Sequence, residues 1–292
     1  MTAARCARPR RIHSVQGMTI TQTAPARPRL PLAARALLTV VAMFAAAFSG
    51  YLASVVPAGA ARTAGTYLCA TVAGLGLAVA LVRGIDRRPV AALGLGRLSP
   101  IGCVVALAVT AAALVAGTLL AAVAGLTMPA PHVPATTVLA SVPVMLMQAF
   151  LLQAFPEEVL FRGYLVQSAL GQLPLWGVTA LSTLVFGVPH LFSGSGATTP
   201  AQRTLFLLLP VGFALLATAL RLRTGSVWPA VAVHGGFHVT WFVVALRVVP
   251  RPESLGAYFS VVGGVLLAVG LASAWWVAGR PRDESAMRPA AG

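Results

Sequence analysis

The feature that most constrains this chain is a series of apolar runs, each about 20 residues long, separated by short polar segments. A helix of that length crosses the hydrocarbon core of a bilayer, where only helices and closed barrels satisfy their backbone hydrogen bonds. The sequence therefore predicts an all-α, polytopic integral membrane helix bundle with about eight transmembrane helices. The predicted spans are residues 36–56, 63–82, 100–126, 138–166, 174–192, 204–222, 226–246 and 256–279.

Composition excludes other classes of protein. The chain is 58% hydrophobic and 9% charged, whereas about 25% of the residues of a soluble domain are charged. Three scattered cysteines, Cys6, Cys69 and Cys103, predict no disulfide framework. The net charge of +15 comes from arginines that mostly flank apolar runs. That placement predicts contact with an anionic lipid bilayer and no binding of nucleic acid.

The distribution of arginine also predicts the topology. With the N-terminus inside the cell, the cytoplasmic segments collect most arginines, Arg35 and Arg221 among them. The opposite side keeps only Arg62, Arg203, Arg247 and Arg251. By the positive-inside rule, both termini are predicted to be cytoplasmic.

The chain divides into a membrane domain and two tails. Residues 1–31 have no long apolar stretch and predict a disordered, basic cytoplasmic tail rather than a signal peptide, with Met18 as an alternative start to Met1. Residues 32–280 are predicted to form one membrane domain, and residues 281–292 a polar cytoplasmic tail.

Only two of the six acidic residues, Glu157 and Glu158, fall within an apolar span. The other four are predicted to lie in loops or tails, where charge costs little: Asp86, Glu253, Asp283 and Glu284. An ionised group at the bilayer centre costs roughly 2.5 to 3.5 kcal/mol, so such groups usually face a polar interior and mark function.

On a helix, Glu158 and Arg162 stand four residues apart and pair, while Glu157 points about 100° away. A carboxylate left free in a poorly solvated site suits a general base that accepts a proton from water. The alternative is that the stretch FPEEVLFRG is a cytoplasmic loop, because Pro156 can break a helix and Gly163 can end one.

Three of the five histidines, His190, His234 and His238, lie within or at the ends of predicted spans. His234 and His238 are four residues apart and share a helix face, a spacing that serves metal ligation or a pair of hydrogen-bond donors. For any one of them alone, a hydrogen bond between packed helices is the simpler interpretation.

No soluble-enzyme motif competes with these residues. The Gly94 to Gly96 stretch lies in an Arg-flanked loop, without the strand and helix that a dinucleotide site requires. The glycines Gly74, Gly76, Gly263 and Gly264 are predicted to permit close helix packing.

Three motifs occur in order along the chain: EExxxR from Glu157 to Arg162, FxxxH from Phe186 to His190, and HxxxH from His234 to His238. Together they resemble those of the CPBP family of intramembrane proteases, also known as the type II CAAX prenyl endopeptidase or Abi family. The stretches LGLGR at 93–97 and TGSVWPAVAVH at 224–234 look like sequences that flank the core helices of that family. The resemblance covers residues 90–245, roughly.

The resemblance implies an endopeptidase that hydrolyses peptide bonds within the membrane. Glu157 and His190 would activate the attacking water, and Glu158, Arg162 and Phe186 would support the site. His234 and His238 would stabilise the oxyanion or, with His190, bind a divalent metal such as zinc. Members of the family commonly have Asn where this chain has His238, which leaves the oxyanion and metal roles open.

The resemblance also sets the expected partners and location. The implied substrate is a hydrophobic peptide or a membrane-anchored protein, and the composition is typical of a bacterial cell membrane protein. Two alternatives are a non-catalytic scaffold of the same family and a proton-coupled transporter that uses the same Glu and His residues as a relay.

Overall fold

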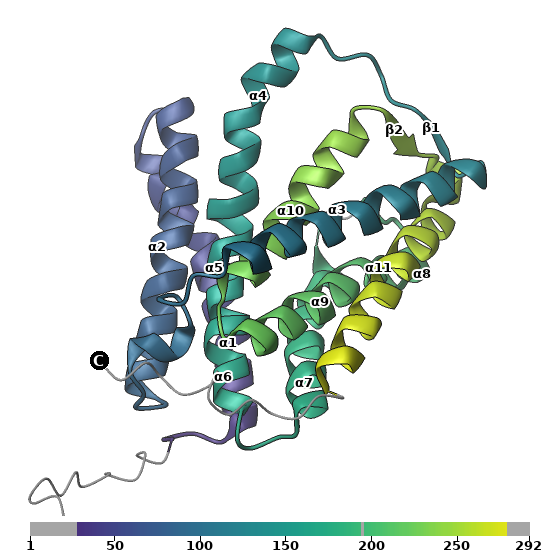
Figure 1. Ribbon diagram of the computed structural model, residues 1–292. Coiled ribbons are helices and arrows are strands. Elements are labelled where there is room, and N and C mark those ends of the chain that lie inside the picture. The colour runs from purple at the N-terminus through teal and green to yellow at the C-terminus, as the bar shows by residue number, and fades with distance from the viewer. Residues whose placement is uncertain (1–27, 194–195, 279–292) are drawn as a thin grey trace, which may run out of the picture.

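The computed structural model describes residues 28–193 and 196–278, and almost all of them are helical or in short loops (Figure 1). The predicted polar tail at 281–292 and most of the predicted basic tail, residues 1–27, lie outside the described residues. In chain order the elements are α1 (Leu32–Phe48), α2 (Ala60–Gly84), α3 (Pro100–Val123), β1 (Thr127–Pro129), α4 (Ala135–Met147), α5 (Phe155–Glu158), α6 (Val166–Ala169), α7 (Leu175–Gly187), α8 (Pro200–Phe206), α9 (Leu208–Thr224), α10 (Trp228–Ala245), β2 (Val248–Pro250) and α11 (Leu255–Ala278).

Seven helices of the described chain are long and apolar enough to cross a membrane, which confirms the all-α polytopic prediction. They are Leu32–Val55, Ala60–Gly84, Pro100–Val123, Ala135–Ala169, Leu175–Phe192, Pro200–Thr224 and Pro252–Ala278. Large apolar side chains on their outer faces are solvent-exposed in the isolated chain, for example Leu37, Ile101 and Trp275. Such a surface is stable only against lipid, so the chain is an integral membrane protein.

The remaining predicted span, residues 226–246, is helix α10, which is not among these seven. His234 and His238 lower its hydropathy, and its buried residues run from Pro229 to Phe237. Helices α3 and α9 pack against it. Because protein rather than lipid surrounds this half of α10, the helix can hold polar side chains at membrane depth.

The region from Ala135 to Ala169 forms one helical rod, in which π-helical stretches separate α4, α5 and α6. These stretches are Gln148–Ala154 and Val159–Leu165. Pro156 explains the first of them, because proline lacks an N–H and crowds the preceding turn. The carbonyl of Leu151 accepts a hydrogen bond from the Thr71 hydroxyl of α2 instead, at 2.5 Å. Neighbouring helices commonly satisfy backbone groups freed in this way.

The alternative that FPEEVLFRG is a solvated loop is wrong, because the stretch lies inside the rod and is helical throughout. The side chains of Glu158 and Arg162 are both 0% exposed. Their burial makes the pair a feature of the bundle interior.

Glycines allow close crossings at some of the predicted positions. A Cβ added at Gly263 of α11 would lie 2.5 Å from the Leu208 side chain, and one at Gly74 of α2 would lie 2.5 Å from Pro156. The prediction is confirmed for these two positions, but Gly76 and Gly264 have nothing within 4 Å.

The prediction that Asp86 is a loop residue with a freely solvated charge is wrong. Asp86 does follow the end of α2, but its side chain is buried in an ion pair with Arg35. Arg35 and Arg221, which were counted among the solvated cytoplasmic charges, are buried as well. The sequence could not reveal this, because their partners lie far away along the chain.

Candidate active site

The carboxylate of Glu158 lies at the centre of a buried polar cluster that joins the rod to α10. Its Oε1 accepts a hydrogen bond from Arg162 Nη1 at 2.9 Å and contacts His234 Nδ1 at 3.0 Å. The i, i+4 pair between Glu158 and Arg162 confirms the predicted facing of these two residues. His234 comes from a helix 76 positions further along the chain. We call Glu158, Arg162, Phe186, His190, His234 and His238 the site cluster.

The guanidinium of Arg162 is bonded on several sides. Its Nη2 donates to the Ala214 carbonyl at 3.2 Å, and its Nε donates to the Thr218 hydroxyl at 3.4 Å, both on α9. The central carbon of the guanidinium, Cζ, lies 4.5 Å from the centre of the Phe186 ring. These contacts hold a desolvated cation that would otherwise be costly inside the bundle.

Phe186 is the packing centre of the site. Its ring contacts four other rings, those of Phe161, His190, Phe213 and His234. This packing keeps the buried polar groups around Phe186 away from bulk water.

His190 joins this cluster from the last turn of the fifth span. Helix α7 ends at Gly187, and a 3₁₀ turn, Val188–Phe192, carries His190. Its Nδ1 contacts the Phe186 carbonyl at 2.9 Å, and its ring centre lies 4.7 Å from that of Phe186.

His234 and His238 share a face of α10, as predicted, with ring centres 5.2 Å apart. The Nε2 atom of His238 is buried and has no hydrogen-bond partner. A buried polar atom without a partner costs free energy unless a ligand or water fills the position.

Glu157 lies beside the site cluster on a neighbouring face of the rod, and no hydrogen bond or ring contact joins it to the three histidines in the described chain. Its Oε2 is buried without a partner. It borders a small pocket between α1 and the rod, lined also by Met43, Ala46, Ala47, Leu152, Pro156 and Leu160. The predicted division into one paired and one free carboxylate is therefore present.

The stretches 93–97 and 224–234, which resemble sequences that flank the core helices of the family, contact each other in the structure. Trp228 Nε1 donates to the Leu95 carbonyl at 2.8 Å, and Val227 N donates to the Gly94 carbonyl at 3.3 Å. Arg221 joins both to the site, because its Nε donates to the Arg162 carbonyl at 2.9 Å and its Nη2 to the Ala92 carbonyl at 3.1 Å.

The donor set does not fit a metal ion as it is arranged. Among the described residues, no group of three or more His, Cys, Asp or Glu side chains is placed to hold one. The Nδ1 atoms of His190 and His234 face the Phe186 carbonyl and Glu158 respectively. We therefore route no chemical step through a metal.

Sequence reasoning missed Thr218, Ser182 and Phe213. Thr218 lies between Arg162 and the Ser182 hydroxyl, which is 3.4 Å away. Phe213 packs against the ring of His234, with centres 4.8 Å apart. Buried hydroxyls in apolar spans were a usable signal, but threonine and serine also bond to their own helix, as Thr218 does to Ala214.

Comparison with protein-family models gives a match over part of the chain. Residues 139–240 match the model of the family described as Rce1-like, type II CAAX prenyl endopeptidase. A search among curated proteins found no match. The matched region contains every residue of the site cluster and Glu157, and it supports a CAAX-type intramembrane endopeptidase in general terms. The match and the three motifs within it support membership of this chain in the CPBP family.

Proposed function

We propose that this protein is an intramembrane endopeptidase in which Glu157 is the general base and His190 helps to orient the attacking water. The observation that carries the proposal is the unequal state of the two adjacent glutamates. Glu158 is bonded to Arg162 and His234, whereas Glu157 keeps a buried oxygen without a partner. Oε2 of Glu158 also lacks a partner, but its carboxylate is paired with a cation, Arg162, which weakens it as a base, whereas no ion pair joins Glu157 to a described residue.

In the proposed reaction, the water oxygen forms a bond to the scissile carbonyl carbon while one of its protons passes to Glu157. The C–N bond of the tetrahedral intermediate then breaks, and the same proton passes from Glu157 to the departing amine. The products are a carboxylic acid and an amine, so the glutamate returns to its starting state. His190 is held against Phe186 within the site cluster and would orient the water.

His234 and His238 are not equivalent in this proposal. Because Glu158 is paired with Arg162, it accepts the Nδ1 proton of His234, and the Nε2 atom of the neutral ring is then an acceptor. A neutral His234 therefore cannot donate to an oxyanion through Nε2. His238 has a buried, unpartnered Nε2 and is the better oxyanion donor.

The substrate class follows from the surroundings of the site. The site cluster lies among helices whose outer faces are apolar, so a hydrophobic peptide or a membrane-anchored protein is the substrate that reaches it. The proposal extends to a cytoplasmic position of both termini in a bacterial cell membrane, as the arginine bias indicates.

The test compares the full chain with its Glu157→Gln and Glu253→Gln variants, purified in detergent. Each is incubated with a library of hydrophobic and isoprenylated peptides, with and without a chelator, and the products are identified by mass spectrometry. We expect Glu157→Gln to lower the cleavage rate by about 10²- to 10⁴-fold. The exposed Glu253, 3.9 Å from Arg251, serves as the matched control and should leave the rate unchanged.

Equal product profiles for the wild type and a folded Glu157→Gln variant would overturn the proposed role of Glu157. Peptide binding without cleavage in the wild type would favour the scaffold, and proton-coupled flux in vesicles would favour the transporter. Loss of cleavage with chelator would contradict a mechanism without metal.

A further inference from the structure

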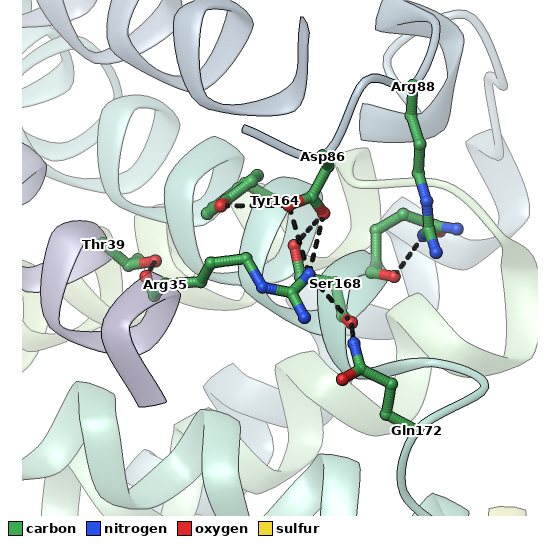
Figure 2. A network of polar contacts seen from close by, with 8 residues as sticks. Arg35, Thr39, Asp86, Arg88, Tyr164, Ser168 and Gln172 are labelled. Atoms are coloured by element: carbon green, nitrogen blue, oxygen red, sulfur yellow. Dashed lines mark hydrogen bonds and ion pairs between the residues drawn. The ribbon is translucent and has the colours of Figure 1, made fainter. Parts of the chain in front are cut away.

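A second buried ion pair lies away from the site cluster, where α1, the loop after α2 and the end of the rod meet (Figure 2). Arg35 Nη1 donates to both carboxylate oxygens of Asp86, at 3.1 and 3.2 Å. The Asp86 carboxylate also accepts from the Tyr164 hydroxyl at 3.3 Å and the Ser168 hydroxyl at 2.5 Å. We call Arg35, Asp86, Tyr164 and Ser168 the anchor cluster, and all four side chains are buried.

The same neighbourhood satisfies the end of the rod. The last four carbonyls of a helix have no partner within it and must find donors elsewhere. Here two arginines from other elements supply some of them, which also places positive charge at the negative end of the helix dipole (Figure 2). The bonds are Leu170 N to Val166 O at 3.0 Å, Arg88 Nη1 to Gln167 O at 2.7 Å, Gln172 Nε2 to Ser168 O at 2.6 Å, Arg35 Nη1 to Ser168 O at 3.4 Å and Gln172 N to Ala169 O at 3.0 Å.

Helix α2 and the loop that follows it hold the rod on both sides of the two glutamates. Before them, Gly74 lets α2 approach Pro156 so closely that a Cβ would lie 2.5 Å from the proline side chain. After them, Asp86 bonds to Tyr164 and Ser168. The segment with Glu157 is thus held at both ends by one neighbouring element.

The rod between these two points is not a regular α-helix. The π-helical stretch Val159–Leu165 begins directly after Glu158. A π-helical turn is rare, and a change to α-helical hydrogen bonding would rotate the residues on one side of it relative to the other. The direction of Glu157 therefore depends on contacts that fix both ends of the stretch.

We propose that Asp86 is a positioning residue for the endopeptidase reaction. Through Tyr164 and Ser168, Asp86 fixes how the last turn of the rod is rotated about the rod axis. Because the π-helical stretch connects that turn to Glu157, the same contacts fix the direction of the Glu157 side chain. The inference rests on the proposed function, since it assigns Asp86 a purpose through Glu157. Asp86 touches neither the substrate nor the reacting atoms.

The first test follows the position of residue 157 without using activity. In a full chain whose Cys6, Cys69 and Cys103 are replaced by alanine, Glu157→Cys is labelled with a small methanethiosulfonate reagent. Adding Asp86→Asn should change the labelling rate by about tenfold, because the reactivity of a buried thiol follows its access to reagent. Leu146→Cys, on the exposed side of α4, is the control and should label at the same rate with and without Asp86→Asn.

The second test separates kcat from KM in the native-cysteine protein. Asp86→Asn should lower kcat by about 10- to 100-fold with little change in KM, since a misplacement of about 1 Å costs that much. The exchanged pair Arg35→Asp/Asp86→Arg should recover part of kcat if the ion pair is what holds the rod. Glu253→Gln should match the wild type.

If Asp86→Asn does not fold, Ser168→Ala and Tyr164→Phe decide, because each removes a single hydrogen bond to Asp86 and should lower kcat in the same direction. Unchanged labelling of residue 157 and unchanged kcat in these variants would overturn the positioning role. Failure of the proposed function would give a different result. The wild type would then cleave no peptide, or Glu157→Gln would cleave as fast as the wild type, while Asp86→Asn would still change the labelling of residue 157.

Discussion

The protein buries two clusters that each contain an arginine–carboxylate pair, and the clusters differ in how completely their carboxylates are bonded. In the anchor cluster, both oxygens of Asp86 accept hydrogen bonds. Around the site cluster, the Oε2 atoms of Glu157 and Glu158 and the Nε2 atom of His238 have no partner. A fully bonded buried carboxylate holds elements together, whereas unbonded polar atoms inside a bundle are expected where water or substrate binds.

The largest expected effect breaks the anchor cluster, in which both Asp86 oxygens are bonded although Arg35 Nε has no partner among the described residues. Asp86→Ala leaves Arg35 as an unpaired buried charge and should destabilise the protein by about 3 to 5 kcal/mol. The double change Asp86→Leu/Arg35→Leu removes both charges and should recover most of that loss. The midpoint of thermal unfolding in detergent measures both, and similar midpoints for the single and double variants would contradict the argument.

The next effect concerns the site cluster, where buried polar atoms lack partners among the described residues. His238→Leu should lower kcat by about 10²- to 10³-fold, or roughly 2.7 to 4 kcal/mol, because it removes the proposed oxyanion donor. His238→Asn keeps a donor and should retain most of the activity. Peptide cleavage by the two purified variants measures the difference, and equal rates for Leu and Asn would remove His238 from the mechanism.

A smaller effect tests the contact between α2 and the rod. Gly74→Ala introduces a Cβ 2.5 Å from the Pro156 side chain and should cost about 1 to 3 kcal/mol through overpacking. Gly76→Ala, two residues along the same helix with nothing within 4 Å, is the matched control and should be neutral or slightly stabilising. Thermal unfolding compares them, and an equal response would show that the crossing is not tight.

The smallest effect concerns the support of Arg162. Thr218→Val removes the hydroxyl that bonds to the Arg162 guanidinium and should cost about 1 kcal/mol. The same substitution at Thr63, an exposed residue whose hydroxyl bonds to the Gly59 carbonyl, gives the control. If Thr218→Val unfolds at the wild-type midpoint, the Thr218 hydroxyl does not help to hold Arg162.

Much of the fold was predictable because apolar length is a strong signal in a membrane protein. For example, the predicted spans 100–126 and 138–166 agree within a few residues with the helices Pro100–Val123 and Ala135–Ala169. The pairing of Glu158 with Arg162 followed from helical spacing alone. The contact of Glu158 with His234 did not follow, because residues 76 positions apart meet only through the packing of α10 against the rod.

The anchor cluster marks the limit of sequence reasoning. Asp86 and Arg35 lie near the ends of apolar runs, where solvated charges are the rule, so local sequence favoured the wrong interpretation. Burial of that pair depends on Tyr164 and Ser168, which lie 78 and 82 positions after Asp86 in the chain.

The sequence by itself determined that the chain spans a membrane, roughly where its apolar spans lie, and that Glu158 pairs with Arg162 inside one of them, since these follow from hydrophobic length and helical period. The tertiary structure decided which polar residues became partners. It packed Phe186, which carries His190 one turn later, against Arg162 and His234, and it left Glu157 without a hydrogen-bond partner among the described residues while Glu158 acquired two. The reason is physical: partnership inside a bilayer depends on distances between helices, and no local pattern encodes those distances.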